Sequence, residues 1–556
     1  MNRVRALIYS SPSKVEYNVK RPGHNPYASQ MSNPGLAQPQ PYNCNIKTEH
    51  QVFVNQEAPP RRNSSESACS VKGQPPHTPF ISQDGWHFET PSTYSQPPTI
   101  FENHGCPPLS SFLETAIPVT GNDRPLLDHF IDNVLRLAFP VLEVHSQSIP
   151  RLRAILDSLK TNKSYFHCCL SVSAIHLKTT MNISSDRIDH DVMRHRYGAI
   201  SQLCKTLSNE AEHKNILDAT LAMVFYHCSV GAPDDYLPDI PWHDHFQAAA
   251  NLVEKLEISS DPHVPPPFSM SLTTWIDILG ATMLGKAPKF APTYRRKHLT
   301  GTPSGLRELM GCDDRIMYLI SEISCLEALK SEGRIDDLRI CQHVSALGGQ
   351  LEFTEPADTA LTTPYNPSGA ICPEKLTTNI SAVFRAAARI YLCTLIPGIN
   401  RDHPNIAHLV ATVVNILPYI PSGPYGFDRS LVWPLLITGA YSGPSSPFRR
   451  ILVERAASLS DVGDFGSFGR MCRVLQEVWR LTDEPVSLPT LTRSTKTYID
   501  PETLLPLPGL KHNYQEEEGR SPSPPISYTL GLRSIKRQQV QWRDVMVRNG
   551  WKYLLI

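Results

Sequence analysis

The chain lacks an excess of charge of either sign and lacks any long apolar run. Lys plus Arg and Asp plus Glu each total 53 in 556 residues, so the formal net charge is zero. A protein that binds nucleic acid over much of its surface is usually basic, and this balance argues against that class. No stretch approaches the ~20 apolar residues that span a bilayer. The N-terminal MNRVRALIYSSPSK has too short an apolar stretch for a signal peptide. We therefore expect neither a membrane protein nor a secreted one.

The short motifs that identify most enzyme classes are also missing. The sequence has no Gly-x-Ser-x-Gly elbow, no P-loop and no dinucleotide fingerprint. Asp464-Phe465-Gly466 spells a kinase motif. Neither a Gly-rich phosphate loop nor a His-Arg-Asp catalytic loop accompanies it, so the match is a coincidence.

Cysteine and histidine occur without the spacing of a metal site. The 13 Cys are scattered, with one close pair at Cys168–Cys169. An odd number of Cys without a framework spacing indicates reduced thiols inside a cell. His243-Asp244-His245 and His167 beside the Cys pair could suggest ligands. A zinc site needs three or four converging ligands, however, and adjacent side chains on a helix point about 100° apart. We expect no metal at either place.

Clustered carboxylates in the stretch DDYLPD are the strongest candidate for chemistry. Asp234, Asp235 and Asp239 imitate the Asp-Asp-x-x-x-Asp pattern by which class I terpene synthases hold Mg²⁺ through hard oxygen ligands. The surrounding Pro residues place the stretch in a loop, and Asp313-Asp314 does not continue as the second metal motif of those enzymes. An all-α, Mg-dependent terpene-synthase-like enzyme is therefore the alternative, and a chain that is not an enzyme and needs no cofactor is the main expectation.

Composition divides the chain into four parts. Residues 1–118 are rich in Pro, Ser and Gln and are predicted to be disordered. Residues 119–485 carry apolar residues at helical spacing, and residues 486–530 form a polar, Pro-rich linker. The segment 531–556 is predicted to form a helix and an apolar tail that dock on the helical body. Because no strand-like alternation stands out, the predicted fold is all-α, built of antiparallel helix pairs.

The most regular stretch, residues 214–256, predicts two amphipathic helices joined by an Asp- and Pro-rich connection. Gly231 is placed to end the first helix, since the prolines that follow forbid its continuation. Asp123 is a plausible N-cap for the first helix of the body, with Pro125 in its first turn. Residues 286–303 are expected to be irregular and residues 348–374 to be a loop. The other expected helices cover 151–160, 165–178, 191–207, 272–284, 306–329, 377–395, 405–417, 431–440 (interrupted by Pro434), 448–459 and 465–480.

Several long segments resemble the fungal-specific transcription factor domain, a helical regulatory region found after a zinc cluster. The resemblance covers roughly residues 123–479 and is closest to regulators of sexual development. It is carried by PLLDHFIDNVLRLAFPVLE, NKSYFHCCLSVSAIHLKTT, IPWHDHFQAA, LRELMGCDDRIMYLISEISCLEAL, AARIYLCTLIPGINRDHPNI, YIPSGPYGFDRSLVWPLLITGAYSGPSSPFR, FGSFGRMCRVLQEVWR and WRDVMVRNGWKYLLI.

The resemblance implies a nuclear regulator of RNA polymerase II transcription whose helical body modulates activity, contacts the transcription machinery or partner regulators, or forms a homodimer. In that family the zinc cluster contacts DNA and begins with Cys-x-x-Cys. This sequence has no Cys-x-x-Cys, and its first Cys are Cys44, Cys69 and Cys106. DNA binding is therefore expected only indirectly or through a missing N-terminal module. A missed upstream exon is the favoured explanation, beside a natural variant that acts through a partner and a relic.

Overall fold

The computed structural model describes residues 117, 119, 121–144, 149–180, 186–207, 212–231, 241–256, 266–355, 361–459, 463–483 and 540–556. Within these ranges the regular structure is helical and contains no strand. One isolated antiparallel bridge joins Tyr365 to Ile371. The all-α prediction is confirmed. The division at residues 118, 485 and 530 falls among residues outside these ranges or beside them, so it stays a prediction.

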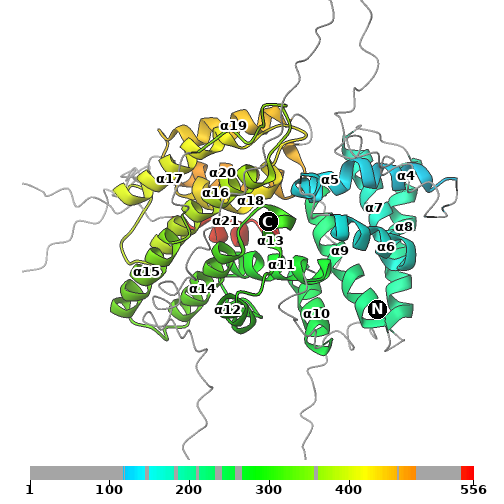
Figure 1. Ribbon diagram of the computed structural model, residues 1–556, viewed down its shortest axis with the longest axis horizontal. Helices are drawn as coiled ribbons and strands as arrows, with labels where there is room; N and C mark the ends of the chain where they lie inside the picture. The colour runs from blue at the N-terminus through cyan, green and yellow to red at the C-terminus, as the bar shows by residue number, and fades with distance from the viewer. Residues whose placement is uncertain are drawn as a thin grey trace, which may run out of the picture.

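The first half of the body packs around α7, which lies among the cyan and teal helices of Figure 1. Small side chains such as Cys169, Ser173 and Ala174 are fully buried on α7 and let α4, α6, α8 and α9 approach it closely. The elements of this half are α4 (Arg124–His129), a π-helical turn η2 (Phe130–Val134), α5 (Leu135–Ala138), a 3-10 turn η3 (Pro140–Glu143), α6 (Ile149–Thr161), α7 (Lys163–Thr180), α8 (Asp186–Leu207), α9 (His213–Val230) and α10 (Trp242–Lys255).

The second half packs around α16 and α18, and Figure 1 shows it beside the first half. All of α18 is buried, and Trp433 stacks on Phe384 of α16 while its Nε1 donates to Thr282 Oγ1 at 2.8 Å. The elements are α11 (Phe268–Leu284), α12 (Ala291–Thr300), α13 (Leu306–Met310), α14 (Asp314–Ser331), α15 (Asp337–Glu352), α16 (Pro373–Cys393), α17 (Pro404–Ile416), the 3-10 turns η6 (Leu417–Tyr419) and η7 (Asp428–Leu431), α18 (Val432–Ala440), α19 (Pro447–Ser458), α20 (Gly466–Asp483) and α21 (Trp542–Arg548).

The helix pair predicted over residues 214–256 is present as α9 and α10, which contact each other. Gly231 follows the last residue of α9, and Pro241 precedes the first residue of α10. The carbonyl of Gly231 also accepts a hydrogen bond from Gly466 N at 2.9 Å. The pair is therefore attached to the start of α20, more than two hundred residues later in the chain.

Residues 286–303 were predicted to be irregular, and this is wrong, because α12 lies there. Pro292 stands in the first turn of α12, where its missing N–H leaves no intrahelical bond unmade. Arg295 of α12 forms two 2.8 Å hydrogen bonds with the carboxylate of Glu322, which is fully buried on α14. A contact with a distant helix thus stabilises a segment whose own apolar pattern is weak.

Other boundaries differ for local reasons. The helix expected over 306–329 is divided at Gly311, whose φ of 85° ends α13, and Asp313 then caps α14 by accepting from Arg315 N.

Pro434 does not interrupt α18, because it lies in the first turn. Asp123 stands before α4 but does not cap it, since its side chain accepts from Arg194. The helix α11 begins at residue 268 and not 272, and α15 extends to residue 352, inside the expected loop.

Candidate functional site at the junction closed by the C-terminal segment

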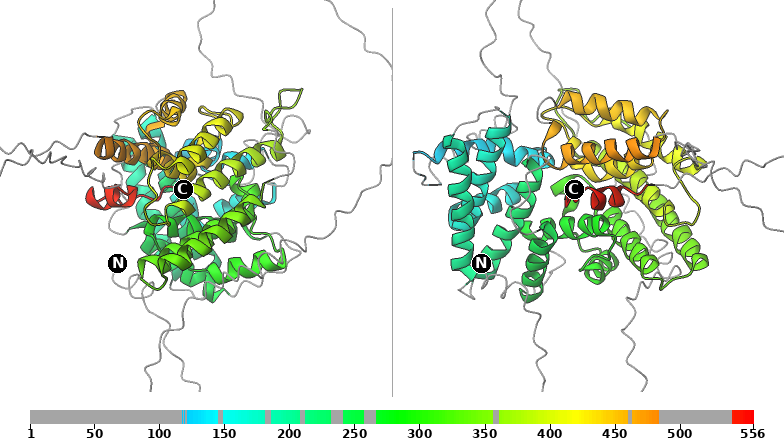
Figure 2. Two further views of the ribbon diagram at one scale, coloured as in Figure 1. Left: turned by 90° about the vertical axis from the view of Figure 1, so that its left-hand side faces the viewer. Right: turned by 180° about the vertical axis from the view of Figure 1, so that it is seen from behind.

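The C-terminal segment lies in the centre of the molecule. Seen from behind in Figure 2, α21 lies beside α20, between the early and the late helices of the second half. Trp542, Val545 and Met546 of α21 are buried. The four residues Tyr553–Ile556 are buried as well, so an apolar segment at the end of the chain belongs to the same core as α4 and α18.

Polar contacts hold this segment at both of its ends. Arg543 donates to both carboxylate oxygens of Glu327, at 2.6 and 2.8 Å, and through Nε to Thr282 O at 2.7 Å. Tyr391 also donates to Glu327, at 2.5 Å. At the other end, Ser467 Oγ donates to Ile556 O at 3.1 Å. The segment thereby connects α11, α14 and α20, and Glu327 extends the contact to α16.

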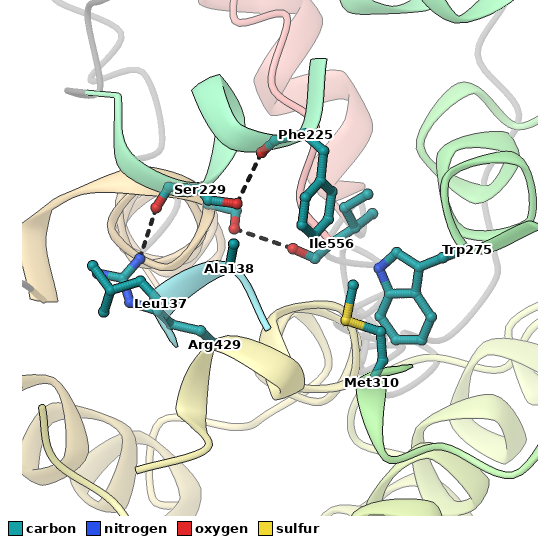
Figure 3. A pocket seen from close by; sticks show the side chains of 9 residues that line it. Leu137, Ala138, Phe225, Ser229, Trp275, Met310, Arg429 and Ile556 are labelled. Atoms are coloured by element: carbon teal, nitrogen blue, oxygen red, sulfur yellow. Dashed lines mark hydrogen bonds between the residues drawn. The ribbon is translucent and has the colours of Figure 1, made fainter. Parts of the chain in front are cut away.

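Ile556 closes a small junction between the two halves of the body, drawn in Figure 3. Arg429 donates to Ser229 O at 2.9 Å, and burial lowers the pKa of Arg429 to about 10. The remaining cavity of about 10 Å³ has room for one water molecule, not for a substrate. Its lining residues are Leu137, Ala138, Phe225, Ser229, Trp275, Met310, Arg429, Ser467 and Ile556. The junction is therefore a place of packing and attachment.

Buried charges elsewhere are used by the fold. Asp428 is fully buried and accepts from Arg455 Nε at 2.5 Å. Asp277 accepts from the backbone N–H groups of Lys289 and Phe290 and from the hydroxyl of Tyr294. Burial raises the pKa of Asp277, and these three donors lower it. These carboxylates are occupied by donors from other elements, which is the arrangement of structural groups.

Where the structure describes the candidate metal ligands of the sequence, it does not bring them together as a metal site. Asp234, Asp235 and Asp239 lie in 232–240, outside the described residues. His243 Nε2 lies 3.6 Å from Asp244 Oδ1 in the first turn of α10, and burial lowers the pKa of His243 and of His245. In the part of the chain that the structure describes, no group of three or more His, Cys, Asp or Glu is placed to hold a metal ion.

The Cys pair and the Asp-Phe-Gly tripeptide have packing roles. Cys168 and Cys169 are buried, and burial raises the pKa of Cys168 to about 12 and raises that of Cys169 well above its ordinary value, so both remain thiols. Gly466 has a φ of 65° and lies against the backbone of Ser229. Sequence reasoning assigned no role to Gly466, Arg429 or Arg543, because their partners are far away in the chain.

Comparison with known proteins identifies the family of the helical body. Residues 125–556 match the family described as "Fungal specific transcription factor domain". No helix in the described ranges is long and apolar enough to cross a bilayer. No solved structure matches this chain.

Curated relatives carry the names of transcription regulators, and nothing in these comparisons supports a terpene synthase. The chain is 43% identical over 535 residues to "Transcriptional regulatory protein pro1" of Neurospora crassa, covering 93% of this chain and 73% of that protein. It is 27% identical over 244 residues to "Transcription factor dibT" of Pestalotiopsis microspora, covering 39% of this chain and 37% of that one. It is 26% identical over 183 residues to "Trichothecene biosynthesis transcription regulator TRI10" of Trichoderma arundinaceum, covering 32% and 38%. The chain therefore belongs to the family of proteins that carry the fungal-specific transcription factor domain.

Proposed function

We propose that this chain regulates transcription by RNA polymerase II in the nucleus, with its helical body as a regulatory and protein-contacting domain. The observation that carries the proposal is the likeness to a named transcriptional regulator over 93% of the chain. The body supports it, because the buried charges described above are occupied by structural partners and the central junction has no room for a substrate. Regulation of sexual development is the process that the sequence resemblance favours.

DNA contact is proposed to be indirect, or to come from a module that this sequence does not contain. The sequence has no Cys-x-x-Cys and no net positive charge. Because phosphate contacts supply much of the affinity for DNA, a chain without a basic excess is a poor candidate for binding DNA alone. The partners proposed are the transcription machinery, other regulators or a second copy of the chain.

Tethering the chain to a promoter tests the proposal. The full chain is fused to a heterologous DNA-binding domain of known site preference, and a reporter with those sites is measured in a fungal host. A change in reporter output relative to the DNA-binding domain alone is expected. The matched control carries Trp433→Asp, which places a charge in the core beside Phe384 and should return the reporter to baseline. Unchanged output from a stably folded fusion would contradict the proposal.

A gel-shift experiment at physiological salt tests the indirect route to DNA. The purified chain should show no preference between random duplexes, because its sequence has no Cys-x-x-Cys with which a zinc cluster would begin. Tight binding to one duplex sequence by the chain alone would show that DNA recognition resides within these residues.

A further inference from the structure

A cavity of about 460 Å³ lies along the faces of α16 and α17, far larger than the central junction. Its volume falls within the range of pockets that hold small organic ligands. The residues that α16 contributes recur every three or four positions, as in Lys375, Asn379, Ala382, Arg385 and Arg389, so one face of the helix lines the cavity along about four turns. Neither the packing described above nor the proposed function involves this cavity.

Arg385 is the unusual group in this cavity. It is only 7% exposed, and it donates through Nε to Thr354 Oγ1 and through Nη2 to Thr354 O, both at 2.8 Å. Both acceptors are neutral. Among the described residues, Arg385 forms no ion pair and its Nη1 donates to no group. A guanidinium that is mostly buried and bonded only to neutral acceptors is stabilised by an anion that reaches its Nη1.

The neighbouring carboxylates compensate this cation only in part, since Glu355 and Asp313 act on it from a distance and form no ion pair with it. Arg389, one turn further along α16, is bonded to Glu352 at 2.9 Å. Glu355 and Glu374 line the cavity but are themselves exposed, so water screens their charges. Burial lowers the pKa of Arg385, with Glu355 opposing that effect. The guanidinium stays charged at neutral pH because its ordinary pKa is far above 7.

The rest of the lining indicates what kind of anion fits. Apolar surface comes from Leu361, Ala382, Ala386, Leu409 and Ile416. The remaining lining is polar or charged, and it includes Glu355 and Glu374, which would repel a second anionic group. The mixed lining therefore favours a ligand with an apolar body and a single anionic group. Carboxylate oxygens also match the planar fork of a guanidinium.

We propose that the cavity between α16 and α17 binds a small amphipathic monocarboxylate, with its carboxylate on Arg385 and its apolar body along Ala382 and Ala386. Such a ligand contacts α16, α17 and Glu355, which follows the end of α15. The chain thereby contains a site at which a metabolite stabilises the second half of the body. This inference goes beyond the proposed function, since binding can be measured whether or not the chain regulates transcription.

Binding of 4-phenylbutanoate to the purified full chain tests the proposal, with 4-phenylbutan-1-ol as an uncharged ligand of the same skeleton. Saturable binding, followed by calorimetry and by ligand-observed NMR, is expected for the carboxylate at up to about millimolar concentration. The alcohol should bind at least about ten-fold more weakly, because it cannot form a charge-assisted bond with Arg385. Absence of saturable carboxylate binding, or equal binding of the alcohol, would overturn the proposal.

Variants locate the site. Arg385→Gln should weaken carboxylate binding about ten-fold or more and leave the alcohol unaffected. Arg339→Gln makes the same change in charge on the exposed side of α15, where Arg339 lies beside Asp336, and should leave both affinities within about two-fold. Ala382→Phe fills the cavity without removing the guanidinium and should weaken both ligands. Ala382→Phe keeps the test decisive if Arg385→Gln fails to fold. Wild-type affinity for the carboxylate in Ala382→Phe would show that the ligand binds elsewhere.

Discussion

Gly466 shows how one residue attaches two distant helices. Its φ of 65° lies in the left-handed region, and a Cβ at this position would lie 2.0 Å from the carbonyl oxygen of Ser229. The amide of Gly466 donates to Gly231 O at 2.9 Å, which brings the start of α20 against the end of α9. Two requirements therefore coincide here, positive φ and a close approach of two backbones. Packing therefore explains why the Asp-Phe-Gly tripeptide ends in glycine.

Replacing Gly466 by Ala should destabilise the protein by roughly 3 kcal/mol or more, because backbone strain and a steric clash add. Urea denaturation followed by circular dichroism measures the loss. Gly369→Ala is the matched control: φ is 82° there, but nothing lies within 4 Å of the added Cβ. That variant should lose only about 1 kcal/mol, the cost of positive φ alone. Equal losses in the two variants would mean that the contact with Ser229 contributes nothing.

At the scale of elements, α7 carries two histidine pairs in contact with its neighbours. His176 Nδ1 lies 2.8 Å from His129 Nε2 of α4, and His167 Nδ1 lies 3.0 Å from His195 Nδ1 of α8. Burial lowers the pKa of His129 and of His195 to about 4 and that of His176 to about 3, and also lowers the pKa of His167. In each pair one ring can donate its N–H to a nitrogen of the other, and protonating both rings would remove the acceptor and place two cations side by side.

Stability should therefore fall in acid. Because the folded pKa values lie below the unfolded value of about 6.5, the unfolded chain binds protons more readily. The stabilisation is complete well above pH 6.5 and is lost as the pH falls toward 4, by roughly 1–2 kcal/mol at pH 5 for each of His129, His176 and His195. The urea midpoint at pH 7 and at pH 5 measures this difference.

His176→Gln isolates the histidine contribution from that of carboxylates titrating in the same range. This variant should reduce the loss between pH 7 and pH 5 by roughly 1–2 kcal/mol, since Gln does not titrate. His408→Gln removes an exposed histidine on α17 and should leave the loss unchanged. An identical pH dependence in wild type and His176→Gln would rule out the buried pairs as its source.

Helix positions could be predicted in most places where a helix carried its own apolar stripe, although α15, with Ile340, Val344 and Leu347, was missed. The stripe of α9, with Leu217, Leu221 and Val224, is readable without any partner, and these residues are buried. In contrast, α12 has few apolar residues and depends on Arg295 meeting Glu322 across 27 residues. Local periodicity carries no information about such a contact, which is why that helix was missed.

For the whole molecule, the C-terminal segment decides how the two halves are joined. Buried residues from Leu126 to Ile556 form one continuous apolar cluster, so loss of packing at the tail affects both halves. Arg543 and Glu327 are 216 positions apart in the chain, and both side chains are largely buried. We therefore expect the body to unfold as one cooperative unit.

Leu554→Ala should lower the free energy of unfolding by about 2–5 kcal/mol, because Leu554 is fully buried and its removal leaves a cavity. Differential scanning calorimetry should show one transition, shifted to lower temperature. Val547→Ala alters the same segment at a side chain that is 81% exposed and should change stability by less than about 0.5 kcal/mol. Two separate transitions, or a loss in Leu554→Ala as small as in the control, would indicate that the tail is not part of the common core.

The sequence by itself determined the all-α class, most helix positions and the family, because these depend on local periodicity and on long contiguous segments. It also indicated that an apolar tail would be costly in water. Only the tertiary structure decided what that tail contacts, that Gly466 meets Ser229, that four histidines form two partly buried pairs, and that Arg385 faces a cavity without an ion-pair partner. Each of these depends on groups brought together from distant parts of the chain, where burial and the loss of water give a side chain its chemistry.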